Sequence, residues 1–309
     1  MAEPIAQPEK IDFGLASIAQ GERAKFLAGE FGSCPLLSDA ENYCREGRHG
    51  MAEDKGEGNF PEVKETRRCP LAEAKEAIRR RRDALADCSM VVELAAKYGV
   101  SFDMNRPLWF QLLRAMNPDA PITWTSDGKT HKPLRDLLDS VYRGCQQPNR
   151  NAPHLLLQGG CGLGKTTIQG VLYLAACEAG FSAAMFDSLY LRKLATNLNS
   201  RFQPTAEAAD KEMAGLVRRD VLVWSDVADT QATRGEFAET VTALLERFHG
   251  RLILSANLKP AQLMEHPDIQ QRAVSRMLAA RHGKASVHIE LVGTDQRKNG
   301  APQQAVLEL

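Results

Sequence analysis

The chain has 309 residues, of which 43% are hydrophobic and 25% are charged, the balance of a globular protein with a buried core. Lys plus Arg and Asp plus Glu each number 39, so no net charge draws the whole chain to nucleic acid or to a membrane surface. There is no run of about 18 apolar residues for a membrane span and no signal-peptide pattern at the start, and the seven cysteines are an odd number. A reduced, cytoplasmic protein is therefore expected.

Scattered cysteines mark the N-terminal part of the chain. Four side chains there supply the sulfur and nitrogen ligands that a tetrahedral Zn²⁺ site needs: Cys34, Cys44, His49 and Cys69. Their spacing, C-x9-C-x4-H-x19-C, lacks a closely spaced C-x2-C pair. A zinc site is therefore one hypothesis for this region, and isolated thiols with a surface histidine are the other.

A long helical pattern and then a turn-rich stretch follow. An apolar residue recurs every seven positions, at Leu71, Ile78, Leu85 and Val92, which predicts one helix with a single apolar stripe. Gly99 stands where such a helix would end. Turn dipeptides between residues 100 and 150, such as Asn117-Pro118 and Asp127-Gly128, predict a connector to a second domain.

From residue 153 onwards, short apolar runs alternate with amphipathic segments. The apolar runs predict strands at 154–158, 181–186, 221–225, 251–256 and 286–292. Between them, residues 165–179, 189–199 and 236–248 have helical periodicity. Strands that alternate with helices predict an α/β fold, in which a parallel sheet is covered by helices on both faces.

The string GGCGLGKTT satisfies the G-x-x-x-x-G-K-[ST] pattern of a phosphate-binding loop, with a strand predicted before it and a helix that opens at Lys165. Glycines are needed because such a loop turns its backbone N–H groups inward around phosphate oxygens. The Lys165 ammonium would neutralise the β- and γ-phosphates of ATP, and the Thr166 hydroxyl would bind Mg²⁺. The candidate loop residues are Gly159, Gly160, Cys161, Gly162, Leu163, Gly164, Lys165, Thr166 and Thr167.

An acidic residue is expected at the tip of a later buried strand, where a carboxylate can hold Mg²⁺. VLVWSDVAD fits, with Asp226 at the strand tip, although such sites usually have two adjacent acids and this chain has Ser225-Asp226. Either Asp226 is the magnesium carboxylate and the water-activating acid is missing, or Ser225 has replaced the magnesium residue. Asp229 is a candidate substitute, and both alternatives predict slow hydrolysis.

Asn257 ends the next predicted strand, in RLILSANL. An amide at that point can reach the γ-phosphate and the attacking water, although an asparagine after a strand is also a common turn residue. Asn257 is therefore a further candidate of the catalytic site.

The ordered set LLLQGGCGLGKTT, DVLVWSDVAD, RLILSANLKPAQL, QQRAVSRML and VHIELVGTDQR resembles the AAA+ ATPases of the DnaC and DnaI helicase-loader type and their IstB-type transposition relatives. The resemblance covers roughly residues 150–300. It implies a P-loop AAA+ ATPase core preceded by a mainly helical N-terminal region. It also implies that Arg276 is an arginine finger for a neighbouring subunit, with Arg272 in reserve, and that Arg297 contacts the γ-phosphate of its own subunit.

The same resemblance implies partners and a division of the chain. The expected protein is a homo-oligomeric, slowly hydrolysing ATPase that loads a replicative helicase on DNA, most readily single-stranded DNA. The alternatives are an IstB-like helper that binds duplex DNA and directs a transposase, and a nucleotide-gated scaffold with little hydrolysis. Basic side chains for DNA are Arg192, Lys193 and Arg201. The expected parts are a partner-binding region 1–105, a connector 106–150, an ATPase domain 151–300 and a tail 301–309.

Overall fold

The structure is a computed structural model that describes the backbone of residues 42–45, 48–53, 62–68, 70–149, 151–227, 235–266 and 269–295, and side chains from Ala74 onwards. Contacts divide the chain into two compact units, Met1–Arg80 with Glu308–Leu309, and Arg81–Leu307. Among the described residues, none of the helices is long and apolar enough to cross a membrane.

The described part of the first unit opens with a three-stranded antiparallel sheet that the sequence did not predict. It comprises β1 (Asn42–Arg45), β2 (Arg48–Glu53) and β3 (Glu62–Arg68), and β2 is the central strand. The register places the Cα atoms of Cys44 and His49 opposite each other on β1 and β2. Cys34 and Cys69 lie outside the described residues, as do the side chains of Cys44 and His49, so the zinc site stays a prediction.

The long apolar heptad pattern forms two helices, not the single helix expected from the sequence. Helix α2 (Pro70–Ala86) ends before Cys88, whose extended backbone (φ −142°, ψ 94°) precedes α3 (Ser89–Lys97). Because this break rotates the second helix, Val91 is buried and the predicted stripe residue Val92 is 48% exposed. The predicted stop is confirmed, since Gly99 follows α3 with a left-handed φ of +64°.

The second unit is built on a seven-stranded sheet in the order β5-β4-β10-β6-β9-β8-β7. Five neighbouring strands are parallel and correspond to the five predicted ones: β6 (Leu155–Gly159), β7 (Ala183–Asp187), β8 (Val221–Val227), β9 (Arg251–Ala256) and β10 (Val287–Gly293). At the β10 edge, β4 (Ile122–Thr125) pairs antiparallel and carries the short β5 (Lys132–Pro133). The predicted α/β fold with a parallel sheet is confirmed.

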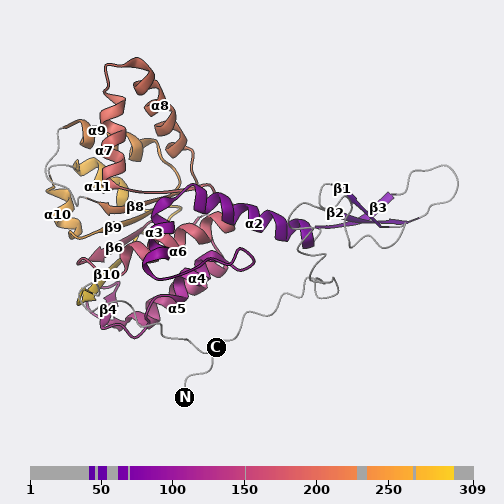
Figure 1. The fold of residues 1–309 in the computed structure, drawn as a ribbon. Coiled ribbons are helices and arrows are strands. Elements are labelled where there is room, and N and C mark those ends of the chain that lie inside the picture. The colour runs from indigo at the N-terminus through magenta and orange to yellow at the C-terminus, as the bar shows by residue number, and fades with distance from the viewer. Residues whose placement is uncertain are drawn as a thin grey trace. The chain divides into compact units, whose positions relative to one another are not determined.

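Helices cover both faces of this sheet (Figure 1). On one face pack α3, α4 (Leu108–Arg114), α5 (Leu134–Gln146) and α6 (Lys165–Glu178). On the other lie α7 (Ser188–Leu198), α8 (Gln203–Val217), α9 (Gly235–Arg247), α10 (Pro260–Met264) and α11 (Gln271–Met277). Each face of the sheet has its own hydrophobic core. Side chains alternate between the faces along β6, so Leu155 and Leu157 lie in the first core and Leu156 lies in the second.

Much of the predicted connector lies in the second compact unit, Arg81–Leu307. Glu178, at the end of α6, accepts hydrogen bonds from the backbone N–H groups of Leu108 (2.6 Å) and Trp109 (3.3 Å) at the start of α4. The same carboxylate pairs with Arg81 Nε at 2.9 Å, and both side chains are nearly buried. The Glu178 carboxylate therefore joins α2, α4 and α6 within the second unit.

Candidate nucleotide-binding site

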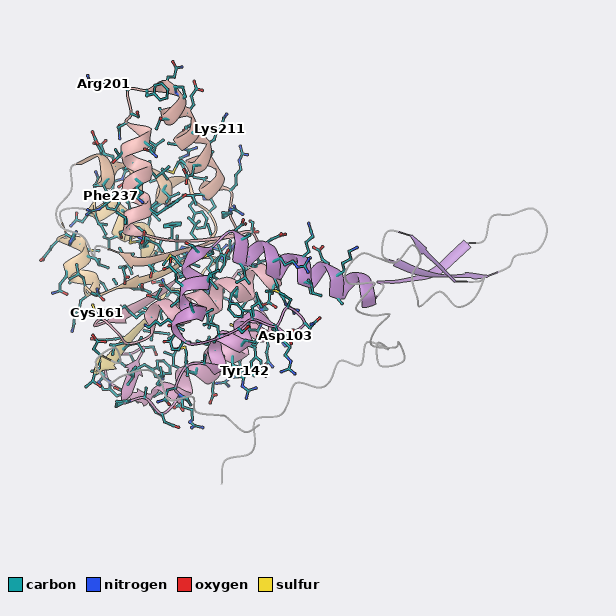
Figure 2. All side chains as sticks on the ribbon, viewed as in Figure 1. Asp103, Tyr142, Cys161, Arg201, Lys211 and Phe237 are labelled. Atoms are coloured by element: carbon teal, nitrogen blue, oxygen red, sulfur yellow. The ribbon has the colours of Figure 1, made fainter. Side chains whose placement is uncertain are left out.

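The phosphate loop connects β6 to α6, which opens at Lys165 as the sequence predicts. Two glycines in it have no room for a side chain. A Cβ on Gly159 would collide with the backbone oxygen of Leu291 on β10, and a Cβ on Gly162 (φ +75°) would collide with the Asp295 carboxylate. The loop is thus pressed against the end of β10, while Cys161 at its outer turn is exposed (Figure 2).

Lys165 is only 5% exposed, and its ammonium group is held by oxygen atoms of the loop and of the neighbouring strand. Nζ donates to the carbonyls of Gly159 (2.7 Å) and Gly160 (2.8 Å) and to Asn257 Oδ1 (2.9 Å). A desolvated ammonium needs such partners, and phosphate oxygens are stronger acceptors than carbonyls. The two side chains that the sequence assigned to the γ-phosphate, Lys165 and Asn257, are therefore in direct contact.

Sheet order explains why Asn257 reaches the loop. Strand β9 lies between β6 and β8, so the residue that follows it stands between the phosphate loop and the tip of β8. Asn257 is half-buried at that point. The carboxyl ends of these three parallel strands meet at one edge, which is where α/β sheets generally bind ligands.

Thr166 and Thr167 lie in the first turn of α6, and both of their hydroxyl groups are hydrogen-bonded. Ser225 Oγ donates to Thr166 Oγ1 at 3.3 Å, and Ser225 is fully buried. The hydroxyl groups of Thr167 and Tyr98 lie 3.1 Å apart and share a hydrogen bond. The strand residue beside the expected magnesium ligand Thr166 is thus Ser225, while Asp226 is the next residue along.

Asp226 occupies a bulge at the end of β8. Trp224 lies opposite Leu254 of β9 and Val227 lies opposite Ala256, so Ser225 and Asp226 together face one residue of β9. Asp226 has a left-handed φ of +54° and is half-buried. Asp229, the suggested substitute acid, lies outside the described residues.

Of the arginines implied by the family resemblance, Arg276 is exposed on α11, whose buried face is formed by Ala273, Val274 and Met277. Arg272 is paired with Glu246 on α9 at 2.5 Å. Arg297 lies outside the described residues. Arg276 therefore lies on the face of α11 that points away from the core, while Arg272 already has an ionic partner.

Some residues of this region carried no signal in the sequence. Tyr98 ends α3 and reaches Thr167, and Asp295 lies against Gly162, although each is distant from its partner along the chain. The motif TDQR drew attention to its arginine, but its aspartate is the residue that touches the loop. Only the fold brings α3 and the end of β10 to the phosphate loop.

No protein-family model and no curated protein matches this chain. Among solved structures it is similar to AMPPCP-bound DnaA from Aquifex aeolicus, with a TM-score of 0.40 and 15% identity over 53% of this chain and 48% of that one. It is also similar to DnaI, with a TM-score of 0.38 and 17% identity over 53% of this chain and 84% of that one. The DnaC helicase loader matches with a TM-score of 0.39 and 16% identity over 50% of this chain and 89% of that one. The chain spans about half the length of the DnaA structures that it matches.

The class of the protein follows from its own strand order and loop: it is an α/β protein with a P-loop between β6 and α6. Structures of the DnaC and DnaI type, the family that the sequence resembles, are among those to which the chain is similar.

Proposed function

We propose that this chain is an AAA+ type ATPase whose nucleotide state switches its assembly on DNA. The observation that carries the proposal is the contact of Lys165 Nζ with Asn257 Oδ1 at 2.9 Å, beside a glycine loop that opens a helix. The loop amides and the positive end of the α6 dipole provide a site for phosphate groups. ATP is the substrate, and its γ-phosphate would compete for the Lys165 ammonium with its three oxygen partners, the two loop carbonyls and Asn257 Oδ1.

Magnesium would be bound at the Thr166 hydroxyl. The 3.3 Å contact with Ser225 supports the alternative in which Ser225 has replaced the magnesium residue and Asp226 is the acid that orients water. Mg²⁺, when bound, neutralises charge on the β- and γ-phosphates. With a neutral hydroxyl in place of a carboxylate, the residues favour Mg²⁺ less strongly, and slow hydrolysis is the consequence.

The exposed Arg276 supports a site completed between subunits. An arginine that stabilises charge on a neighbour's γ-phosphate must be free of its own subunit's core, as it is on α11. Arg297 would contact the γ-phosphate within its own subunit. Nucleotide binding is then coupled to homo-oligomer assembly, because the catalytic arginine arrives only with the neighbour.

The α7 and α8 pair offers a surface for DNA. Lys193 and Arg201 are exposed, and Figure 2 shows Arg201 at the far end of this pair. Phe202 beside it is 66% exposed, which suits stacking on an unpaired base. Arg192 is less suited to DNA, since its guanidinium lies 5.5 Å from the centre of the Phe237 ring. This arrangement favours single-stranded DNA.

The partner that fits these features is a replicative helicase, gripped by the N-terminal region 1–105 and delivered to DNA by the ATPase domain 151–300. A zinc site of Cys34, Cys44, His49 and Cys69 would stabilise that region. An IstB-like helper of a transposase on duplex DNA is the second candidate, and a nucleotide-gated scaffold is the third. Pull-down of a helicase or of a transposase, together with binding to single-stranded and duplex DNA, separates them.

Alkylation of the Cys161 thiol tests the nucleotide site. Cys161 is exposed in the loop, whereas Cys88 and Cys145 are buried. MgATP should protect Cys161 from alkylation, measured peptide by peptide by mass spectrometry. Lys165→Ala should abolish that protection, because the charge-assisted phosphate contacts are lost. Lys211→Ala, which changes an exposed lysine on α8, is the matched control and should leave protection intact. Equal protection in the Lys165 and Lys211 variants would refute the assignment of the cradle.

A further inference from the structure

Two buried serines flank the backbone of Asp226, one in β9 and one at the start of α7. Ser255 lies in β9 and is fully buried. Ser188 is the first residue of α7, directly after β7, and is 2% exposed. Buried hydroxyl groups require hydrogen-bond partners, so each of these two side chains has to lie where its hydroxyl reaches one.

Both backbone polar groups of Asp226 are bound by these hydroxyls. The Asp226 N–H donates to Ser255 Oγ at 3.0 Å, and Ser188 Oγ donates to the Asp226 carbonyl at 2.7 Å. Trp224 Nε1 donates to Ser188 Oγ at 3.1 Å, and Trp224 is 1% exposed. Because its proton is used on Asp226 and its lone pair on Trp224, the Ser188 hydroxyl has a fixed orientation.

These bonds hold a conformation that the strand alone would not adopt. In an unbroken strand, alternation would place Asp226 on the same face as Trp224, in the apolar layer beneath α9. The bulge gives that inner place to Val227 and leaves Asp226 half-buried at the strand tip with φ +54°. Non-glycine residues persist in such conformations when their surroundings hold them there.

We propose that Ser188 and Ser255 are positioning residues for Asp226 in ATP hydrolysis. This inference rests on the proposed function, since it takes Asp226 as the acid of the ATP site. The two serines fix the Asp226 backbone, so they act on the rate of the chemical step and leave the phosphate cradle at Lys165 unchanged. Ser225, on the other side of the strand, keeps its separate contact with Thr166.

The test compares Ser255→Ala and Ser188→Ala with the wild-type protein. Misplacing a catalytic group by about 1 Å costs about tenfold to a hundredfold in rate, so kcat should fall by that factor. The dissociation constant of MgATP should change by less than about twofold, because no cradle contact is lost. Thr242→Val is the matched control: it removes a buried hydroxyl on α9, bonded to Ala238, and should lower stability without lowering kcat.

A double-mutant cycle identifies the residue through which the serines act. Asp226→Asn should lower kcat by itself, and adding Ser255→Ala should then cause little further loss, because the group being positioned is already gone. Trp224→Phe retains both serines and removes the donor to Ser188 together with part of the buried ring, which provides a second probe if Ser188→Ala does not fold. Its kcat should fall by a smaller factor with unchanged MgATP binding.

Unchanged kcat in both serine variants, or a full additional loss in the Asp226→Asn background, would overturn the inference while leaving the ATPase proposal intact. Wild-type protein that binds ATP without turnover would refute both the hydrolysis and the positioning role, and leave ATP binding standing. Wild-type protein that binds ATP no better than Lys165→Ala would refute the proposed function as a whole.

Discussion

The Gly162→Ala substitution tests the contact between the phosphate loop and the end of β10. A methyl group at this position meets two separate obstacles. One is the backbone, since φ is +75°, a left-handed conformation that costs a non-glycine residue about 1–2 kcal/mol. The other is the Asp295 carboxylate, which occupies the space of the new Cβ and would have to turn away, at a cost of about 0.5–1.5 kcal/mol if its side chain leaves its preferred rotamer. The total expected loss of unfolding free energy is therefore about 1.5–3.5 kcal/mol.

Gly128→Ala separates the two contributions. Gly128 has nearly the same φ, +71°, but nothing lies within 4 Å of its added Cβ, so only the backbone cost of about 1–2 kcal/mol applies. Denaturant unfolding measures both variants, and each is repeated with Asp295→Ala. In that background the Gly162 variant should approach the Gly128 variant. An undiminished loss for Gly162→Ala without the Asp295 carboxylate would refute the contact and the coupling of the loop to β10.

Three other substitutions probe the site and the fold. Ser225→Asp should raise turnover at limiting Mg²⁺, measured by phosphate release, because it adds a carboxylate beside Thr166; an unchanged magnesium dependence would contradict the role given to Ser225. Burial, reinforced by two nearby arginines, lowers the pKa of His154 from 6.5 to about 4. As the pH falls, His154 is protonated in the unfolded chain at a higher pH than in the folded protein. Up to about 3 kcal/mol of stability should therefore be lost between pH 6.5 and pH 4. His154→Gln should flatten that part of the curve of unfolding free energy against pH, and an equally steep curve would count against it. Arg276→Ala mixed with Lys165→Ala should recover ATPase activity that neither variant shows alone, provided that the two are shown to co-assemble.

The parts of the fold that could be predicted from the sequence are those whose signal lies in residues adjacent along the chain. The loop between β6 and α6 is a contiguous motif, and the buried strands are short apolar runs such as RLILSA, which coincides with β9. Helix α5 also had a readable signal, since its buried residues recur at helical spacing: Leu134, Leu137, Leu138, Val141 and Cys145. Turn dipeptides on the N-terminal side of α5 favoured a connector, and in the structure α5 packs in the core of the second unit.

What the sequence did not reveal depends on partners far along the chain. The bulge at Asp226 requires Ser255 from β9 and Ser188 from α7, and no local pattern around SDV announces either hydrogen bond. The break between α2 and α3 is similar, because the heptad pattern runs through it unbroken. Periodicity reports which residues prefer burial, but it does not report where a helix must turn to reach its neighbours.

On the proposed function, the surroundings of Lys165 would connect the phosphate loop to the helix that carries Arg276. An ammonium that is 5% exposed has to be bound by oxygen atoms, and here one of them belongs to Asn257. Phosphate groups carry more charge than the amide, so nucleotide binding would change the partners of Lys165 and loosen the restraint on Asn257. Asn257 directly precedes the segment that leads through α10 to α11, the helix that presents Arg276. On the proposed function, the partner of this one buried lysine would thus link the occupancy of a subunit's own site to Arg276, the residue offered to its neighbour.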